Sequence, residues 1–209
     1  MSAEVRERGL DQFYTLPDIA RKCIELVETH FPWNHWDLVI EPSAGNGSFF
    51  HQIPVESKIG IDIEPQSPDI QKGDYLEYSP PTHAEILVIG NPPFGKVSSK
   101  AIQFFNHSAT YANCIAFIVP RTFRKQSVQS RLNLSFHLIH DEDIREKPCA
   151  FHPPMNAKCC FQIWVRKSEQ REVVPLPIEH ADWDFLPFGP SDQRGQPTPP
   201  QGAHFAIRA

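Results

Sequence analysis

The sequence predicts an α/β fold built on a doubly wound, mostly parallel sheet. Short apolar runs typical of buried strands alternate along the chain with segments whose apolar residues recur at helical spacing. Glycines and prolines follow several of these runs directly, at the points where strands of open α/β sheets end and bind ligands. Because crossovers between parallel strands are right-handed, this alternation places helices on both faces of the sheet.

The order of the elements follows from the same patterns. A helix is expected over 19–30, with Thr15 as its N-cap, Pro17 in its first turn and apolar residues along one face. Further helices are expected over 98–111 and 122–132. Strands are expected over 37–41, 58–63, 69–72, 85–89, 114–119, 134–140 and 160–165.

Length and composition favour one domain followed by a tail. The chain has 209 residues, of which 40% are hydrophobic, enough for a substantial core. We expect the domain to cover 1–167. From 168 to 209 the sequence is rich in proline and contains Trp183, Phe185 and Phe188. This tail is expected to pack on the domain through its aromatic side chains or to be partly disordered, and 202–208 could add an edge strand.

Targeting signals and cysteine spacing bear on the compartment. The sequence has no apolar run of 18 residues and no signal-peptide pattern, so we expect no membrane partner and an intracellular location. Bacterial cytoplasm or a phage-infected cell is favoured, and the nucleus is the eukaryotic alternative. The five cysteines show no CxxC spacing, which fits a reducing compartment. Cys149, His152 and the Cys159–Cys160 pair lack paired ligand spacing, and no metal is expected.

The most informative motif is Asn91-Pro92-Pro93-Phe94, directly after the apolar run 85–90. Two prolines stop the strand and stiffen the exit, so an amide, a backbone carbonyl and an aromatic ring lie at a strand's carboxyl end. The Asn91 oxygen and the Pro92 carbonyl can each accept one N–H of a planar exocyclic amine, and Phe94 can stack on its ring. Two such acceptors favour a tetrahedral nitrogen, whose lone pair is then free to attack. An ordinary proline-stiffened turn is the alternative.

Three further motifs follow earlier strands in order. Gly45 and Gly47, in EPSAGNGSF (41–49), allow a sharp turn and a close backbone approach to a ligand. Asp62 ends the next strand about 20 residues on, where an acid binds ribose hydroxyls. Asp74 follows the third strand and can accept from an adenine amino group, with Tyr75 or Leu76 against the ring. Taken singly, each acid could equally be a solvated loop residue.

Charge is distributed unevenly. The net charge is -5, yet all 25 acidic residues lie outside 86–140. That stretch, which begins at the NPPF motif, carries Lys96, Lys100, Arg121, Arg124, Lys125 and Arg131. We interpret it as a basic lip that steers a polyanion to the site. A chance gap in acids, with solvated basic side chains, is the alternative.

These motifs together resemble a known family. The series DQFYT (11–15), EPSAGNGSF (41–49), GIDIEP (60–65), GDYL (73–76) and NPPF (91–94) is similar to the S-adenosylmethionine-dependent amino-methyltransferases. The resemblance is greatest to the gamma-type N6-adenine methyltransferases of bacteria, phages and restriction–modification systems, and it covers roughly 11–166. It implies a Rossmann-like, seven-stranded methyltransferase sheet, mostly parallel with a reversed last strand.

The resemblance also implies roles for particular residues. Phe13, Tyr14 and Thr15 would close over the methionine end of S-adenosylmethionine, and Glu41 with the turn Ala44, Gly45 and Gly47 would surround its amino group and carboxylate. Asp62 would bind the ribose, and Asp74 with Tyr75 the adenine. Asn91 would lie beside the cofactor and, with Pro92 and Pro93, hold the target N6. Phe94 and Phe151 would contact the flipped base. The basic lip, rather than the resemblance, assigns the nucleic-acid contacts to Lys96, Arg121, Arg124 and Lys125.

The chain departs from this family because only about 40 residues follow CFQIWV (160–165). Many gamma enzymes carry a large target-recognition domain there, so recognition is expected to come from loops or from a protein partner. DNA is the favoured substrate. Three alternatives stay open: adenine in RNA, a protein glutamine amide (those enzymes usually have tyrosine after NPP), and an inactive cofactor-binding subunit of a heteromeric methyltransferase.

Overall fold

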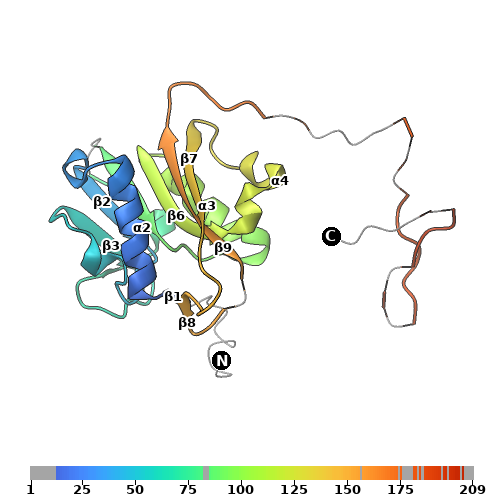
Figure 1. The fold of residues 1–209 in the computed structure, drawn as a ribbon, viewed down its shortest axis with the longest axis horizontal. Helices are drawn as coiled ribbons and strands as arrows, with labels where there is room; N and C mark the ends of the chain where they lie inside the picture. Colours follow the sequence, from blue (N-terminus) through green and yellow to red (C-terminus); the bar gives the residue numbers. More distant parts are fainter. Residues whose placement is uncertain are drawn as a thin grey trace. The chain divides into compact units, whose positions relative to one another are not determined.

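The computed structural model describes residues 13–81, 85–155 and 157–173, together with 175, 181–182, 184, 186–193, 195–196, 198–202 and 204. The chain divides into two compact units, Met1–Glu172 and Val173–Ala209. The first unit holds every helix and longer strand labelled in Figure 1. We describe each unit by itself.

The first unit contains a seven-stranded sheet in the order β4-β3-β2-β5-β6-β9-β7. Its strands are β2 (Leu38–Pro42), β3 (Lys58–Asp62), β4 (Gln71–Lys72), β5 (Ile86–Gly90), β6 (Cys114–Pro120), β7 (Phe136–Asp143) and β9 (Cys159–Arg166). The pairs from β4 to β6 are parallel, whereas β9 runs antiparallel to both β6 and β7. The last strand is therefore the reversed one, which confirms the predicted Rossmann-like methyltransferase sheet.

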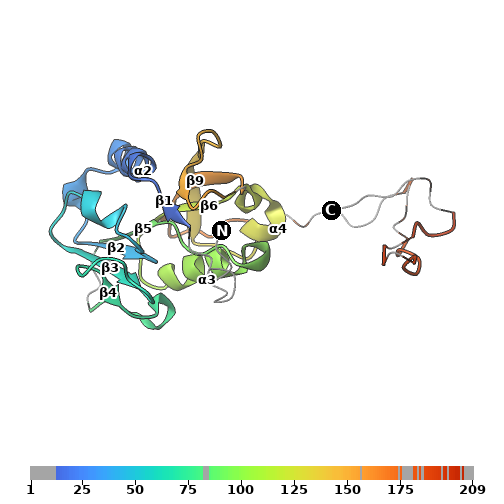
Figure 2. The ribbon, with the colours of Figure 1, turned by 90° about the horizontal axis from the view of Figure 1, so that it is seen from below.

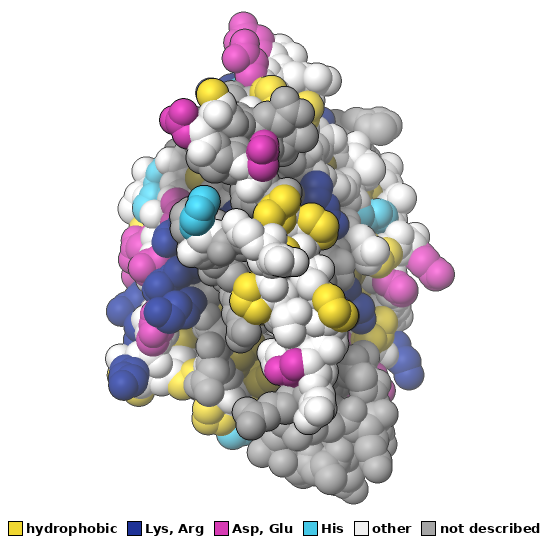
Figure 3. Space-filling view, turned by 90° about the vertical axis from the view of Figure 1, so that its right-hand side faces the viewer, with side chains coloured by type: hydrophobic (Ala, Val, Ile, Leu, Met, Phe, Trp, Pro, Cys, Tyr) yellow, Lys and Arg dark blue, Asp and Glu magenta, His cyan; other side chains and the backbone are white. Residues whose placement is uncertain are grey.

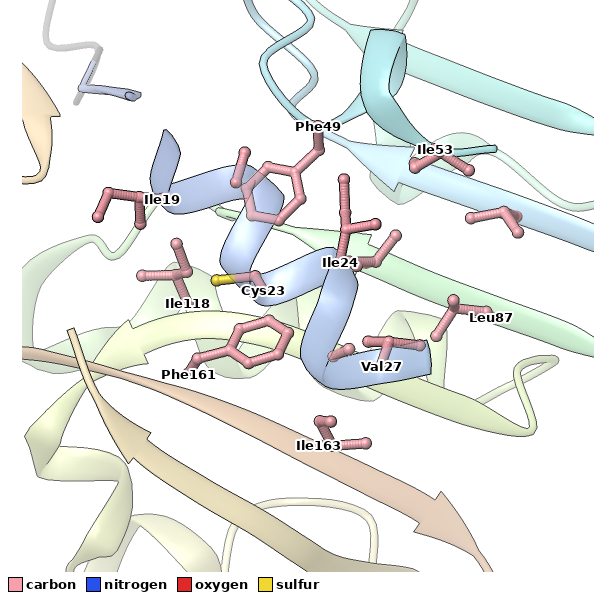
Figure 4. Packing of buried hydrophobic residues seen from close by; sticks show 14 of the residues in the cluster. Ile19, Cys23, Ile24, Val27, Phe49, Ile53, Leu87, Ile118, Phe161 and Ile163 are labelled. Carbon is pink, nitrogen blue, oxygen red and sulfur yellow. The ribbon is translucent and has the colours of Figure 1, made fainter. Parts of the chain in front are cut away.

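Helices cover both faces of this sheet, α2 (Pro17–His30) on one and α3 (Ser99–Ser108) on the other (Figure 2). Alternate residues of each central strand point to opposite faces, so Leu87 and Ile89 of β5 pack in the α2 layer while Ile86 and Val88 pack in the α3 layer. Figure 4 shows the α2 layer, where side chains of the helix meet those of the strands. Burial on both faces explains why β2, β5 and β6 read as continuous apolar runs.

Helix α2 starts later than its predicted cap. Leu16 holds the N-cap position, and no side chain caps the helix. Pro17 occupies the first turn, where the N–H that proline lacks would have no acceptor within the helix. Thr15 instead belongs to β1 (Tyr14–Thr15), which pairs antiparallel with β8 (Phe151–His152). The predicted N-cap role of Thr15 is therefore wrong, because Leu16 occupies that position and Thr15 pairs with Phe151.

The segment after β6 is less helical than predicted. In place of one helix over 122–132, the chain forms a 3₁₀ turn over Arg121–Arg124 and a single turn, α4, over Gln126–Gln129. Lys125, between them, is extended. Strand β7 runs on to Asp143, three residues beyond its predicted end.

The second unit contains a short chain reversal. Gly189 donates its N–H to the Thr198 carbonyl at 2.9 Å, and Thr198 donates to the Pro190 carbonyl at 3.3 Å. Trp183, Phe185 and most of the suggested edge strand (203 and 205–208) lie outside the described residues. Among the described residues, no helix is both long and apolar enough to cross a membrane.

Candidate active site

A hollow of about 380 Å³ lies at the carboxyl ends of β3, β4 and β5. Its walls come from 13–14, 43, 61–64, 73–76, 91–95, 100, 103–104 and 155. The chain begins its sheet at β2, extends outward to β4 and then returns to β5 on the other side of β2. This reversal of strand order opens a crevice at the strand ends, and ligands of doubly wound sheets bind there.

The NPPF residues line this hollow together. The amide nitrogen of Asn91 donates to the Phe13 carbonyl at 3.2 Å, which fixes the amide and leaves its oxygen, Oδ1, buried with no hydrogen-bond partner among the described residues. Phe94 is half-buried between both core layers, and its carbonyl accepts the N–H groups of Lys100 and Ala101. A buried acceptor without a donor costs about 1–3 kcal/mol, a cost that a bound donor removes.

The FYT segment reaches the hollow through a contact distant in sequence. Because β1 pairs with β8, Phe13 and Tyr14 lie across from the segment that carries Met155, and all three line the hollow. Burial, followed by the nearby carboxylates of Asp62 and Glu64, raises the pKa of the Tyr14 hydroxyl. Tyr14 therefore presents a neutral ring and hydroxyl at physiological pH.

The glycine turn after β2 has the geometry that its sequence predicts. Gly45 and Gly47 adopt φ of +54° and +79°, conformations that favour glycine. A Cβ at Gly45 would lie 2.8 Å from the ring of Tyr14, so the turn can pass under that ring only without a side chain. Ala44 is buried beside the turn and donates its N–H to the Ile61 carbonyl, which ties the turn to β3.

Asp62 is fixed by two backbone donors. Its Oδ2 accepts the Gly45 N–H and its Oδ1 the Glu64 N–H, both at 2.8 Å. Each carboxylate oxygen has two lone pairs, so one on each oxygen remains for a ligand hydroxyl. Asp62 lines the hollow and is only half-buried, so an oriented acceptor pair faces the space.

Asp74 and Tyr75 form the floor beyond Asp62. Asp74 is exposed and caps a 3₁₀ turn (Tyr75–Glu77) by accepting the Leu76 N–H at 2.9 Å. Tyr75 contributes its ring to the hollow, while its hydroxyl bonds Ser108 of α3 at 2.7 Å. Its predicted ligand contact can therefore involve only the ring, because the hydroxyl is engaged elsewhere.

Glu41 is the most unusual group near the hollow. It lies one residue before the end of β2 with 3% of its surface exposed, and its Oε2 has no hydrogen-bond partner among the described residues. Burial raises the pKa of its carboxyl well above the usual range, although the Phe50 N–H opposes this shift. A Cβ at Gly90 would lie 3.1 Å from the Glu41 side chain, so the glycine that ends β5 makes room for it.

Two of the six basic residues of the predicted lip are paired with acids. Arg121 pairs with Asp143 and Glu146 at 3.0 and 3.2 Å, and Arg124 binds Asp141 and Asp143. These acids lie on or just after β7, beyond the acid-free stretch, and the sheet brings them back against it. Figure 3 likewise shows Lys and Arg side chains interspersed with Asp and Glu. Arg121, Arg124 and Lys125 lie outside the lining of the hollow.

Lysines closer to the NPPF motif are placed differently. Lys100 lines the hollow and Lys96 is exposed on the loop before it. No ion pair of either lysine is found among the described residues. Lys100 was part of the predicted lip but not one of the predicted site residues.

Phe151 does not line the hollow. It is 5% exposed and packs in the core layer of α2, because its strand β8 is held against β1. The structure therefore gives no support to its predicted contact with a base. Met155 lines the hollow instead, as do Gln103 and Phe104 of α3. Sequence patterns gave no signal for Met155, whereas Gln103 and Phe104 lie on a predicted helix that directly follows the motif.

Metal ligands do not gather in the described part of the chain, where no group of three or more His, Cys, Asp or Glu side chains could hold an ion. All five cysteines are free, and Cys159 and Cys160 lie on β9 facing opposite core layers.

Comparison with known proteins supports the fold. No protein-family profile and no curated protein sequence matches the chain. Among solved structures, one described as an RNA methyltransferase of Pyrococcus horikoshii has a TM-score of 0.58 at 15% identity, over 78% of this chain and 88% of that one. The 23S rRNA methyltransferase ErmE has a TM-score of 0.52 at 16% identity, over 76% of this chain and 71% of that one. The magnesium protoporphyrin IX methyltransferase ChlM of Synechocystis PCC 6803, with bound SAM, has a TM-score of 0.52 at 9% identity, over 72% of this chain and 79% of that one.

At such low identities the likeness establishes architecture only. The chain has the fold of methyltransferases whose substrates, by their names, range from RNA to a porphyrin. Since one fold serves several substrates, the activity has to be argued from the site itself.

Proposed function

We propose that this protein transfers a methyl group from S-adenosylmethionine to the N6 amino group of adenine in DNA. The observation that carries the proposal is the buried amide oxygen of Asn91, which has no hydrogen-bond partner among the described residues and belongs to a residue that lines the same hollow as Asp62, whose carboxylate is held by two backbone donors. An amine acceptor and a ribose acceptor in one cavity suit a cofactor and a target amine bound side by side. The methyltransferase fold is consistent with this pairing.

The residues present fit the cofactor. Glu41 is a buried carboxyl with an unpartnered oxygen, which suits the ammonium of a methionine moiety, because a bound cation offsets the burial of the charge. The free lone pairs of Asp62 suit the two ribose hydroxyls, and Asp74 and the ring of Tyr75 suit an adenine. The cofactor supplies a methyl group on a sulfonium, which is activated toward nucleophiles.

The residues around Asn91 then act on the target amine. The Asn91 oxygen and the Pro92 carbonyl each accept one N–H, which draws the nitrogen toward a tetrahedral form and exposes its lone pair. Pro93 stiffens the loop so that these acceptors keep their positions, and Phe94 stacks on the base. As the N–C bond would form, the bond between the methyl group and the sulfonium would break and leave a neutral thioether. The nitrogen, cationic once methylated, would then lose one proton to water, so no side chain is required as a strong base, and positioning and fixed dipoles provide the catalysis. The adenine must leave its stack to reach them, at a cost of a few kcal/mol.

Adenine in RNA is the second candidate, supported by two similar structures that are named as RNA methyltransferases. The same acceptors would serve it. A protein glutamine amide would also present an N–H donor, and an inactive subunit would bind cofactor without transfer. In each nucleic-acid case we propose that sequence recognition comes from loops near the hollow or from a protein partner.

The test is methyl transfer from labelled S-adenosylmethionine to DNA, RNA and protein, followed by nucleoside and amino-acid analysis. N6-methyldeoxyadenosine from DNA or N6-methyladenosine from RNA identifies the substrate, whereas methylglutamine alone would overturn the proposal. Asn91→Ala is expected to reduce transfer at least a hundredfold while cofactor affinity changes less than threefold. Asn34→Ala, at an exposed asparagine remote in sequence, is the matched control and should leave both unchanged. Full transfer by Asn91→Ala would refute the role of the amide.

A further inference from the structure

The loop after NPPF presents an unusually exposed apolar side chain. Val97 is 76% exposed, the most exposed large hydrophobic residue in the described part of the chain. Its backbone lies in the left-handed region, with φ of 52° and ψ of 41°, and Ser98 follows at φ of 60°. A β-branched residue rarely adopts this conformation, which costs roughly 1–3 kcal/mol. Neither burial nor backbone preference accounts for a valine here.

This loop is held in place at three points. The Phe94 carbonyl accepts the N–H groups of Lys100 and Ala101 at 3.2 and 3.3 Å, which anchors the start of α3. Gly95 passes so close to Lys100 that a Cβ would lie 2.8 Å from the lysine side chain. The buried Ser98 hydroxyl bonds Thr122, after β6, at 2.8 Å. The backbone on both sides of Val97 is therefore held in place, and Val97 lies at the tip of this loop.

The surroundings of Val97 suit a polyanion. Exposed Lys96 precedes it and exposed Lys100 follows three residues later. No ion pair of either lysine is found among the described residues. Gly95 and Lys100, on either side of Val97, both line the hollow that also holds Asn91. An apolar tip between two cations thus lies at the edge of the proposed target pocket.

We propose that Val97 is a wedge that enters the base stack of a duplex and fills the space left by the flipped adenine. The inference rests on the proposed function and deepens it, because it identifies double-stranded nucleic acid as the substrate. Apolar side chains inserted between base steps offset the loss of stacking, which costs a few kcal/mol per step. The lysines on either side would contact the adjacent phosphates.

Two substitutions separate the wedge from the stability of the loop. Val97→Asn removes the apolar surface, and asparagine tolerates the left-handed conformation, so the loop should keep its form. Val97→Leu keeps an apolar wedge. Val173→Asn makes the same change at another exposed valine and serves as the control.

The first measurement is the ratio of methylation rates on a duplex and on the same single strand. We expect Val97→Asn to lower this ratio at least tenfold, Val97→Leu to keep it within about threefold of wild type, and Val173→Asn to leave it unchanged. The second places 2-aminopurine at the methylated adenine of the duplex, once that adenine has been located by fragment analysis. When anisotropy shows that the duplex is saturated with protein, Val97→Asn should give a clearly smaller increase in 2-aminopurine fluorescence than wild type, because less of the target base is out of the stack.

Each outcome decides between the two proposals. An unchanged rate ratio and an unchanged fluorescence increase in Val97→Asn would overturn the wedge and leave the proposed function standing. Wild-type protein that methylates only single strands would do the same. Absence of adenine methylation on every nucleic acid would overturn the proposed function, and the wedge with it.

Discussion

Replacing Glu41 with glutamine should stabilise the free protein while weakening cofactor binding. The carboxyl is almost fully buried, has an oxygen without a partner, and has a pKa raised well above 4.5 by burial. The unfolded chain releases this proton near 4.5, whereas the folded chain holds it to higher pH. The unfolded state therefore binds fewer protons across that window, and the free energy of unfolding falls as pH rises through it.

The magnitude follows from the burial of an unpaired acceptor, which costs about 1–3 kcal/mol and more when it is charged. Glutamine keeps an oxygen for the Phe50 N–H but cannot ionise. In a chain of this size 1 kcal/mol corresponds to about 2–4 °C in Tm, so Glu41→Gln should melt about 2–12 °C higher at pH 8. The gain should shrink toward zero near pH 4, where both states of the wild-type carboxyl are protonated.

The assay is thermal unfolding of wild type and Glu41→Gln between pH 4 and 8.5, with and without S-adenosylmethionine. Added cofactor should raise the Tm of wild type more than that of the variant, because the variant lacks a negative partner for the ammonium. Glu25→Gln, at an exposed position of α2, should change neither quantity. If the Tm of Glu41→Gln at pH 8 is equal to or lower than that of wild type, and the two proteins show the same pH dependence, burial of the Glu41 carboxyl does not destabilise the free protein and the reasoning fails.

Three other changes test separate parts of the site. Asp62→Asn should weaken cofactor binding at least tenfold by calorimetry, because one amide cannot accept from two backbone N–H groups and two hydroxyls; equal affinity would remove Asp62 from the site. Gly45→Ala should lower the free energy of unfolding, measured by urea denaturation, by about 1–2 kcal/mol. The reason is that φ of Gly45 is +54° and that the Tyr14 ring lies 2.8 Å from the new Cβ. The control is Gly73→Ala, which should cost less because the nearest atom to its new Cβ lies 3.9 Å away. Lys100→Glu should weaken DNA binding and reduce the salt slope by about 1 or more. Arg124→Glu should change the slope less, because Arg124 is already paired, and a larger effect at Arg124 would restore the original basic lip.

The sheet could be predicted because its central strands are buried on both faces. Such strands appear as uninterrupted apolar runs, and each of the three that form the middle of the sheet ends within a residue or so of its predicted limit. The candidate site followed from them, since Gly45, Asp62 and Asn91 lie directly after apolar runs. Parallel strands place their carboxyl ends at one edge, so an order in sequence became a cluster in space.

The parts that were missed depend on contacts between distant segments. Strands β1 and β8 are two residues each and gain their stability from pairing across the chain, which leaves no periodic pattern in either. For the same reason Met155 could not be placed in the hollow. The ion pairs of Arg121 and Arg124 could not be predicted because their acidic partners lie on or just after β7, beyond the acid-free stretch.

The topology also explains why the two halves of the hollow differ in charge. The chain forms β2, β3 and β4 before it crosses back to β5, so Asp62 and Asp74 collect on one side of the crevice. Everything from β5 onward to the start of β7 comes from sequence without acids, so Lys100 stands on the other side. Asn91 lines the hollow between these two sides, and its buried oxygen has no hydrogen-bond partner among the described residues. With the cofactor on the acidic side, as proposed, a substrate that is both a polyanion and an amine donor would use Asn91 and the cationic side together, whereas a neutral peptide amide would use only Asn91.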